Sequence, residues 1–331
     1  MTEIDHPSVA EALPSALQAL KTYLRSDLCK YLWCFADPDR KWLADAFSQA
    51  SEQLGLKTYQ MLLPDRTYSE AELEPIKTLL RTLTSENMVL SIFSDGVARR
   101  LPYFRIFPNF SSPQGFAGIS GVLRQRYPDK ALLKHLLTDP ATVRQTIVQV
   151  ERYSGQKLRI TAPGETDLTL EVGPSCVLPY QVSEHKRHAF LPPAEAYLAV
   201  LLGSANGTLV VDVTVGELAT FERGVIDPLG LVDEPVRVTI VDGYATKIEG
   251  GEIARRLQAH LTELGQANRT VVELGFGLSQ GEPTGIIGAD ECLQGTCHFG
   301  IGDDSFFGSK NPAKAHLDWV IREPRVEIIP R

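Results

Sequence analysis

Apolar positions in the first third of the chain alternate between short continuous runs and helical spacing. The runs predict strands at Lys30–Ala36, Lys57–Leu63 and Met88–Phe93, and the spacing predicts helices before Gly55 and over Ser69–Leu83. Ser69 and Glu72 have the spacing of a capping box. Because strands that alternate with helices form parallel sheets covered on both faces, we predict an α/β N-terminal domain with a mainly parallel sheet.

The pattern changes after a predicted helix that begins at Asp139-Pro140 and ends at Gly155. Beyond it, β-branched runs separated by Pro-Gly, Asn-Gly and Asp-Gly turns predict strands at Lys157–Thr161, Thr166–Val172, Thr208–Val213 and Val236–Val241. The second half is therefore predicted to be a mainly β (α+β) domain. We place the boundary near residue 150, which gives domains of residues 1–150 and 151–331.

Composition and charge exclude several classes of protein. The 331 residues are 43% hydrophobic and 22% charged, which is the mix of an ordinary globular protein. A formal charge of -8 repels phosphate backbones, so nucleic acid is not an expected partner. No apolar run approaches the ~20 residues of a membrane helix. The turn after the first predicted strand, Ala36-Asp37-Pro38-Asp39, lacks the glycines of a dinucleotide site.

The cysteines and the N-terminus predict a cytoplasmic location. The five cysteines form no CxxC pair, and their odd number does not suit a disulfide framework. Residues 1–14 carry acidic side chains and no apolar stretch, so we expect no secretory signal.

Two histidine segments are candidates for binding a metal. His298 lies among the small residues of 295–304, where a ligand can approach closely. Eighteen positions later, His316 and Asp318 are two residues apart, which places both on one face of an extended strand. Two imidazoles and one carboxylate suit Zn, Mn, Co or non-haem Fe. A buried hydrogen-bonded histidine and a surface His-Asp pair remain an equal alternative.

Carboxylates in apolar surroundings favour the metal hypothesis. Glu273 lies within Val271–Gly277, where an unpaired charge would be costly to bury. Glu195 is framed by apolar residues in the same way, although strand alternation could place it in solvent. Glu291, next to Asp290, is a candidate for general base chemistry, and a solvated turn is its alternative.

The remaining histidines have weaker support. His185 and His188 flank Lys186 and Arg187, so we interpret this stretch as a surface segment, with a contact to a substrate carboxylate as the alternative. His6, His135 and His260 have no supporting neighbours and are expected to face solvent.

Six motifs occur in one order over about residues 140–325. They are Pro193-Ala194-Glu195-Ala196-Tyr197, Gly203–Thr208, Glu273–Gly277, Asp290-Glu291, Gly295–His298 and His316-Leu317-Asp318. In this order the chain resembles the compact branch of the thermophilic metalloprotease family, which includes aminopeptidases T and S.

The resemblance implies a homodimeric aminopeptidase with an α/β N-terminal domain and a mainly β metal-binding domain. Two divalent ions, commonly Zn, Co or Mn, would activate a water that attacks the first peptide bond. Glu291 would move protons and Glu273 would bridge the ions. The implied metal ligands are Glu195, Glu273, His298, His316 and Asp318.

The chain departs from that family at two places. Ala194 stands where the family typically has glycine before the glutamate ligand. Ser305 stands where larger members carry a tyrosine, and it is followed by Phe306 and Phe307. The second departure leaves the peptidase mechanism open.

The chain also resembles 2,5-dihydroxypyridine 5,6-dioxygenase, a member of the same fold family. This is a ring-opening enzyme with one Fe(II) held by two histidines and one aspartate. His298, His316 and Asp318 would match that set, and Phe306 and Phe307 could stack on a flat substrate ring. Because Glu195 and Glu273 are also present, two ions are favoured over one. The hypotheses are thus a peptide-cleaving hydrolase, a dioxygenase acting on a small molecule, and a metal-free peptide-binding protein.

Overall fold

The computed structural model describes residues 6–94, 97, 118–123, 127–177, 179–183, 186–308 and 311–330, so His185 lies outside it. Contacts between Cα atoms divide the chain into two compact units, Met1–Thr138 with Leu178–Pro193 and Asp139–Val177 with Ala194–Arg331. The predicted boundary near residue 150 assigned residues 178–193 to the second domain, whereas in the structure they belong to the first unit.

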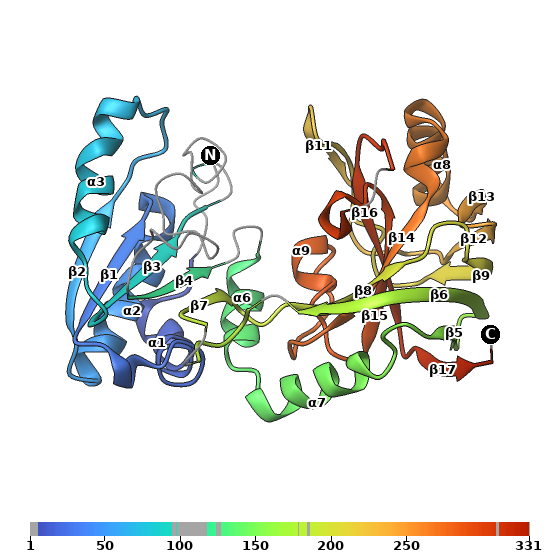
Figure 1. The fold of residues 1–331 in the computed structure, drawn as a ribbon. Coiled ribbons are helices and arrows are strands. Elements are labelled where there is room, and N and C mark those ends of the chain that lie inside the picture. The colour runs from blue at the N-terminus through green and yellow to red at the C-terminus, as the bar shows by residue number, and fades with distance from the viewer. Residues whose placement is uncertain are drawn as a thin grey trace. The chain divides into compact units, whose positions relative to one another are not determined.

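The first unit is built on a five-stranded sheet in which all neighbouring strands are parallel (Figure 1). The order is β2 (Lys57–Leu62), β1 (Tyr31–Ala36), β3 (Asn87–Ile92), β4 (Ile119–Leu123) and β7 (His188–Leu191). The α/β prediction is confirmed, and the three strands that the sequence predicted lie within one residue of their expected bounds.

Helices pack against this sheet through apolar side chains. The helices are α1 (Val9–Gln18), α2 (Lys41–Gln53), α3 (Glu70–Thr82) and α6 (Asp129–Leu136), with helical turns at Ala19–Tyr23, Ser26–Leu28 and Pro38–Arg40. On α3, Leu73 and Ile76 join Phe35 and Val89 of the sheet in one buried cluster. The predicted capping box is present at Ser69, whose hydroxyl accepts from the backbone N–H of the third helical residue.

The fifth strand, β7, was not predicted because charged residues precede its four residues. His188 begins it and is only 6% exposed, with its Nδ1 2.8 Å from the Ser120 hydroxyl. The interpretation of His188 as a surface residue is therefore wrong. His135 and His260 are also buried, which corrects the expectation that they face solvent.

The second unit is a ten-stranded antiparallel sheet, and the mainly β prediction is confirmed. Its longest strand, β6, pairs with β5 and β9 along its first half and with β8 beyond a register shift after Val172. In chain order the strands are β5 (Lys157–Ala162), β6 (Thr166–Val177), β8 (Glu195–Val200), β9 (Asn206–Val211), β12 (Val236–Val241), β13 (Tyr244–Glu249), β14 (Val271–Gly277), β15 (Thr296–Gly302), β16 (His316–Arg322) and β17 (Arg325–Ile329).

Three helices and a separate hairpin complete this unit. The helices are α7 (Pro140–Glu151), α8 (Glu252–Leu264) and the short α9 (Ile287–Asp290), with turns at Gln266–Arg269 and Ser305–Phe307; the hairpin is β10 (Glu217–Thr220) with β11 (Gly224–Pro228). Within the described residues, no helix is both long and apolar enough to cross a membrane.

The two faces of the sheet differ along β8, β14, β15 and β16. One face carries a buried apolar row that includes Leu198, Leu274, Phe299 and Trp319. Tyr153, just beyond α7, contacts Phe276 on that same face, with 5.8 Å between the ring centroids. Because side chains alternate along a strand, the other face is left for the polar residues.

Candidate metal centre

Four adjacent strands place the five predicted metal ligands on one face of the second unit's sheet. Residues paired on antiparallel strands point to the same face. Glu195 pairs with Gly277, Glu273 with Gly300, and Gly300 with Asp318, while His298 pairs with Gly275 and His316 with Gly302. The five ligand residues are Glu195 on β8, Glu273 on β14, His298 on β15, and His316 and Asp318 on β16.

Glycines on the strands next to the two histidines make room for the imidazole rings. A Cβ atom at Gly275 would lie 1.9 Å from Nε2 of His298. A Cβ atom at Gly300 would lie 2.7 Å from Cε1 of His316 and 2.6 Å from Cβ of Glu273. All three distances are far below contact distance, so each ring can lie across the neighbouring strand only because that strand has no side chain there.

The ligand atoms form two groups that share Glu273. In the first group, Nε2 of His298 lies 2.9 Å from Oε2 of Glu195 and 3.7 Å from Oε1 of Glu273. In the second group, Nε2 of His316 lies 3.2 Å from Oδ1 of Asp318 and 3.5 Å from Oε2 of Glu273. The two oxygens of Glu273 thus approach different imidazoles, which is the arrangement of a bridging carboxylate.

Each group could hold one ion, because its ligand atoms lie within 4.8 Å of one another. Among the described residues, the groups with this spacing do not combine His298 with His316. A mononuclear site of two histidines and one carboxylate would need both imidazoles in one group. The geometry therefore fits two ions with one imidazole each better than one ion with two.

The histidine environments fit metal ligation. The Nδ1–H of His316 donates to the carbonyl oxygen of Asp303 at 2.8 Å, which fixes the ring with Nε2 toward the carboxylates. His298 is 0% exposed, and within the described chain neither of its ring nitrogens makes a hydrogen bond of acceptable geometry. Its close approach to Glu195 without such alignment suits two atoms that bind a common cation.

The carboxylates and imidazoles of the centre shift one another's pKa values. Burial raises the pKa of the Glu273 carboxyl, and the nearby Glu195 and Asp318 charges raise it further. Burial opposes protonation of both imidazoles, yet the carboxylates raise the pKa of His298 well above its usual value. Asp318 and Glu273 similarly raise the pKa of His316 to about 10. Without metal, the carboxylates are thus compensated by protons on the imidazoles.

The other predicted site residues lie outside these two groups. Glu291 follows α9 and is buried. Its neighbour Asp290 has a structural role, since its carboxylate accepts the backbone N–H groups of Thr284 and Gly285. The Phe307 ring contacts the Tyr197 ring edge-on at 5.6 Å, whereas the Phe306 side chain lies outside the described part of the structure.

Tyr197 was not predicted as a site residue. It lies two positions after Glu195, on the same sheet face, and pairs with Gly275. Burial, a hydrogen bond with Cys176 and the charges of Glu195 and Glu273 raise its pKa, so it lies close to the ligand carboxylates. Its position two residues after Glu195 was the sequence signal that could have placed it at the site, because such residues share a face of a strand.

Comparison with known proteins assigns the family. The model of the family described as NicX, 2,5-dihydroxypyridine 5,6-dioxygenase, matches residues 35–328, which includes parts of both units. The chain belongs to this family. The resemblance to the dioxygenase is thereby confirmed, and the family is one of enzymes. A comparison with curated protein sequences finds no match.

Solved structures show that the fold is shared with two kinds of protein. The 2,5-dihydroxypyridine dioxygenase of Pseudomonas putida KT2440 superposes with a TM-score of 0.63 at 18% identity, covering 97% of this chain and 94% of its own. AmpT from Thermus thermophilus gives a TM-score of 0.54 at 13% identity, covering 96% and 94%. At these identities the likeness establishes the fold alone.

Proposed function

We propose that the protein is a metal-dependent hydrolase that holds two divalent ions and removes N-terminal residues from peptides. The observation that supports this proposal is the position of Glu273, whose two oxygens approach two imidazoles that each have a further carboxylate beside them. Five ligand side chains on one sheet face exceed what a single ion of the two-histidine, one-carboxylate type requires.

Two divalent ions in this position would lower the pKa of a shared water and polarise the scissile carbonyl. The protein contributes a rigid arrangement of ligands. Glu273 sets the separation of the two groups, and the Asp303 carbonyl fixes the ring of His316. We assign proton transfer to Glu291, whose buried position excludes bulk water. The edges of Tyr197 and Phe307 supply an apolar contact for the substrate.

Metal analysis of protein purified without supplement, together with an amide-cleavage assay, tests this proposal. We expect two Zn, Co or Mn ions per chain and release of the first residue from unblocked peptides. Glu273→Gln should lose both metal and activity, while Glu263→Gln, the same change at an exposed position on α8, should lose neither. One iron per chain and no amide cleavage after addition of Zn, Co or Mn would contradict the proposal.

The family assignment favours a second candidate, a mononuclear non-haem iron dioxygenase that opens an aromatic ring. His316 and Asp318 would supply two ligands, and Tyr197 with Phe307 would contact a flat substrate. Anaerobic reconstitution with Fe(II), followed by oxygen uptake with 2,5-dihydroxypyridine or a catechol, tests this candidate. Oxygen uptake with one Fe per chain would support it, and no uptake would reject it.

The expected peptide or small-molecule substrate, the homodimer and the cytoplasmic location stay predictions. Each follows from the resemblance or from the composition rather than from the geometry of the centre.

A further inference from the structure

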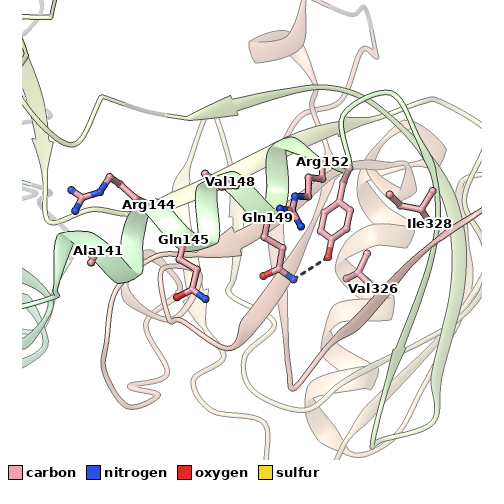
Figure 2. Close-up of a pocket in the computed structure, with 9 residues that line it drawn as sticks. Ala141, Arg144, Gln145, Val148, Gln149, Arg152, Val326 and Ile328 are labelled. Carbon is pink, nitrogen blue, oxygen red and sulfur yellow. Dashed lines mark hydrogen bonds between the residues drawn. The ribbon is translucent and has the colours of Figure 1, made fainter.

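A hollow lies on the surface of the second unit, between the outer side of α7 and strand β17 (Figure 2). It has a volume of about 720 Å³, and its polar lining comes mainly from the helix. A neighbouring hollow of about 630 Å³ shares Ile328 with it and continues to Gly155 and Pro330. Together they form a surface groove, which we call the α7–β17 groove.

This groove is not part of the metal centre. The ring of Tyr153, which lines it, contacts Phe276 on β14. Phe276 alternates with Gly275 and Gly277, so it points to the face opposite the five ligand residues. The helix therefore covers the back of the sheet, and the groove lies outside the route to the proposed active site.

Two arginines give the groove its charge. Arg144 and Arg152 line it, and within the described chain neither guanidinium has an ion-pair partner. The exposed carboxylates on the same elements, Glu151 and Glu327, are not among its lining residues. The two arginines are eight residues apart, which along a helix corresponds to about 12 Å between their Cα atoms.

The rest of the groove lining combines apolar surface with amide groups. Val148 is 50% exposed and Ile328 is 51% exposed, and Val326 lies next to Ile328 on the same side of β17. The Nε2 of Gln149 donates to the Tyr153 hydroxyl at 3.0 Å, which holds this amide in place (Figure 2). Its Oε1 is available to a backbone N–H of an occupant.

We propose that the α7–β17 groove binds an extended acidic segment of a partner protein. Carboxylates pair with guanidinium groups in two parallel hydrogen bonds, and two of them about four residues apart in an extended chain span about 13 Å. The residues between them would cover Val148, and the segment would continue past Arg152 over Ile328 (Figure 2). This match of charge and spacing gives the groove its occupant.

Other occupants fit less well. Two cations around an apolar centre are too few for a nucleic-acid backbone. A second copy of the chain is the competing occupant, because a homodimer is expected, and the oligomeric state tests it.

Fluorescence anisotropy with a labelled acidic peptide tests this inference on the full chain. The probe carries two glutamates four residues apart with apolar residues between them, and its control carries glutamines instead. We expect saturable binding of the acidic probe that is at least tenfold weaker for the double variant Arg144→Gln with Arg152→Gln. Arg255→Gln combined with Lys247→Gln, which also removes two exposed positive charges, should bind the probe like the unchanged protein.

Three outcomes would overturn the inference. They are no saturable binding of the acidic probe, equal binding of the glutamine probe, and an equal loss of binding in Arg255→Gln combined with Lys247→Gln. Sedimentation of the same proteins tests the competing occupant. If the chain is a dimer that only the Arg144 and Arg152 changes dissociate, the groove binds a second copy and the acidic-partner proposal is wrong.

Discussion

At the scale of single residues, the metal centre depends as much on the side chains that are missing as on those that are present. The grouping of the five candidate ligands on one sheet face was expected from the sequence, because their motifs follow one another in a recognisable order. Gly275 and Gly300 could not be assigned a role in this way. The need for glycine arises from a ring on the neighbouring strand, and that neighbour is known only once the register is known.

We expect Gly275→Ala to remove metal binding without unfolding the protein. The new Cβ would occupy the place of Nε2 of His298, which must then leave its position. Loss of affinity should reach at least the roughly 10–100-fold that follows loss of outer-shell partners. Isothermal titration with Zn measures it. Gly173→Ala on β6 is the control, because its Cβ would meet its nearest neighbour at an ordinary 3.7 Å. Equal affinity in both variants would show that the ring does not need this space.

The burial of His188 makes the stability of the first unit depend on pH. Burial lowers its pKa from 6.5 to about 3, so between these values the unfolded chain binds a proton that the folded chain does not. Stability therefore falls as pH decreases from 6.5 toward 3, with a slope of up to about 1.4 kcal/mol per pH unit, and this residue has no effect above pH 6.5. Urea unfolding across this range should show that the free energy of unfolding falls more steeply with decreasing pH in the unchanged protein than in His188→Gln. Equal slopes would contradict the prediction.

At the scale of elements, the sequence predicted the helices and strands whose signals lie in neighbouring residues. Strands β1 to β3, helix α3 with its cap, and the start of α7 at Asp139-Pro140 were found from spacing alone. Strand β7 was missed because its four residues follow a charged run. It becomes buried only by pairing with β4, and 64 residues separate the two strands along the chain.

The capping box of α3 offers a direct measurement at this scale. Ser69→Ala removes the hydroxyl that accepts from the backbone N–H of Glu72. We expect the free energy of unfolding to fall by about 1 kcal/mol, since this is the usual effect of losing such a cap. The midpoint of urea unfolding measures the change. Ser69→Asp, which preserves an acceptor, should restore most of the stability, and no difference between the two variants would contradict the role of the cap.

At the scale of the whole molecule, the metal ions are expected to contribute to the stability of the unit that holds them. Three carboxylates and two imidazoles crowd one face of its sheet, and cations remove their mutual repulsion. An ion present at about 1,000 times its dissociation constant would add about 4 kcal/mol.

Tryptophan fluorescence can localise this effect. The chain has three tryptophans, and Trp319 follows the ligand Asp318 on β16 while Trp33 and Trp42 lie in the first unit. In a variant with both of the latter changed to Phe, a chelator should lower the transition temperature reported by Trp319, and Zn should restore it. With Glu273→Gln added, the chelator should have no effect. A transition that is the same with and without chelator in the first variant would contradict a metal-stabilised sheet.

The return of residues 178–193 to the first unit has a consequence for how the protein is made. Its parallel sheet ends in β7, which the ribosome synthesises only after 39 residues of the second unit, 139–177, have been added. Until then β4 has an open edge that can pair with a strand of another nascent chain. A gene fragment that stops after residue 138 would keep this edge permanently, so we expect it to associate through β4 unless residues 178–193 are supplied.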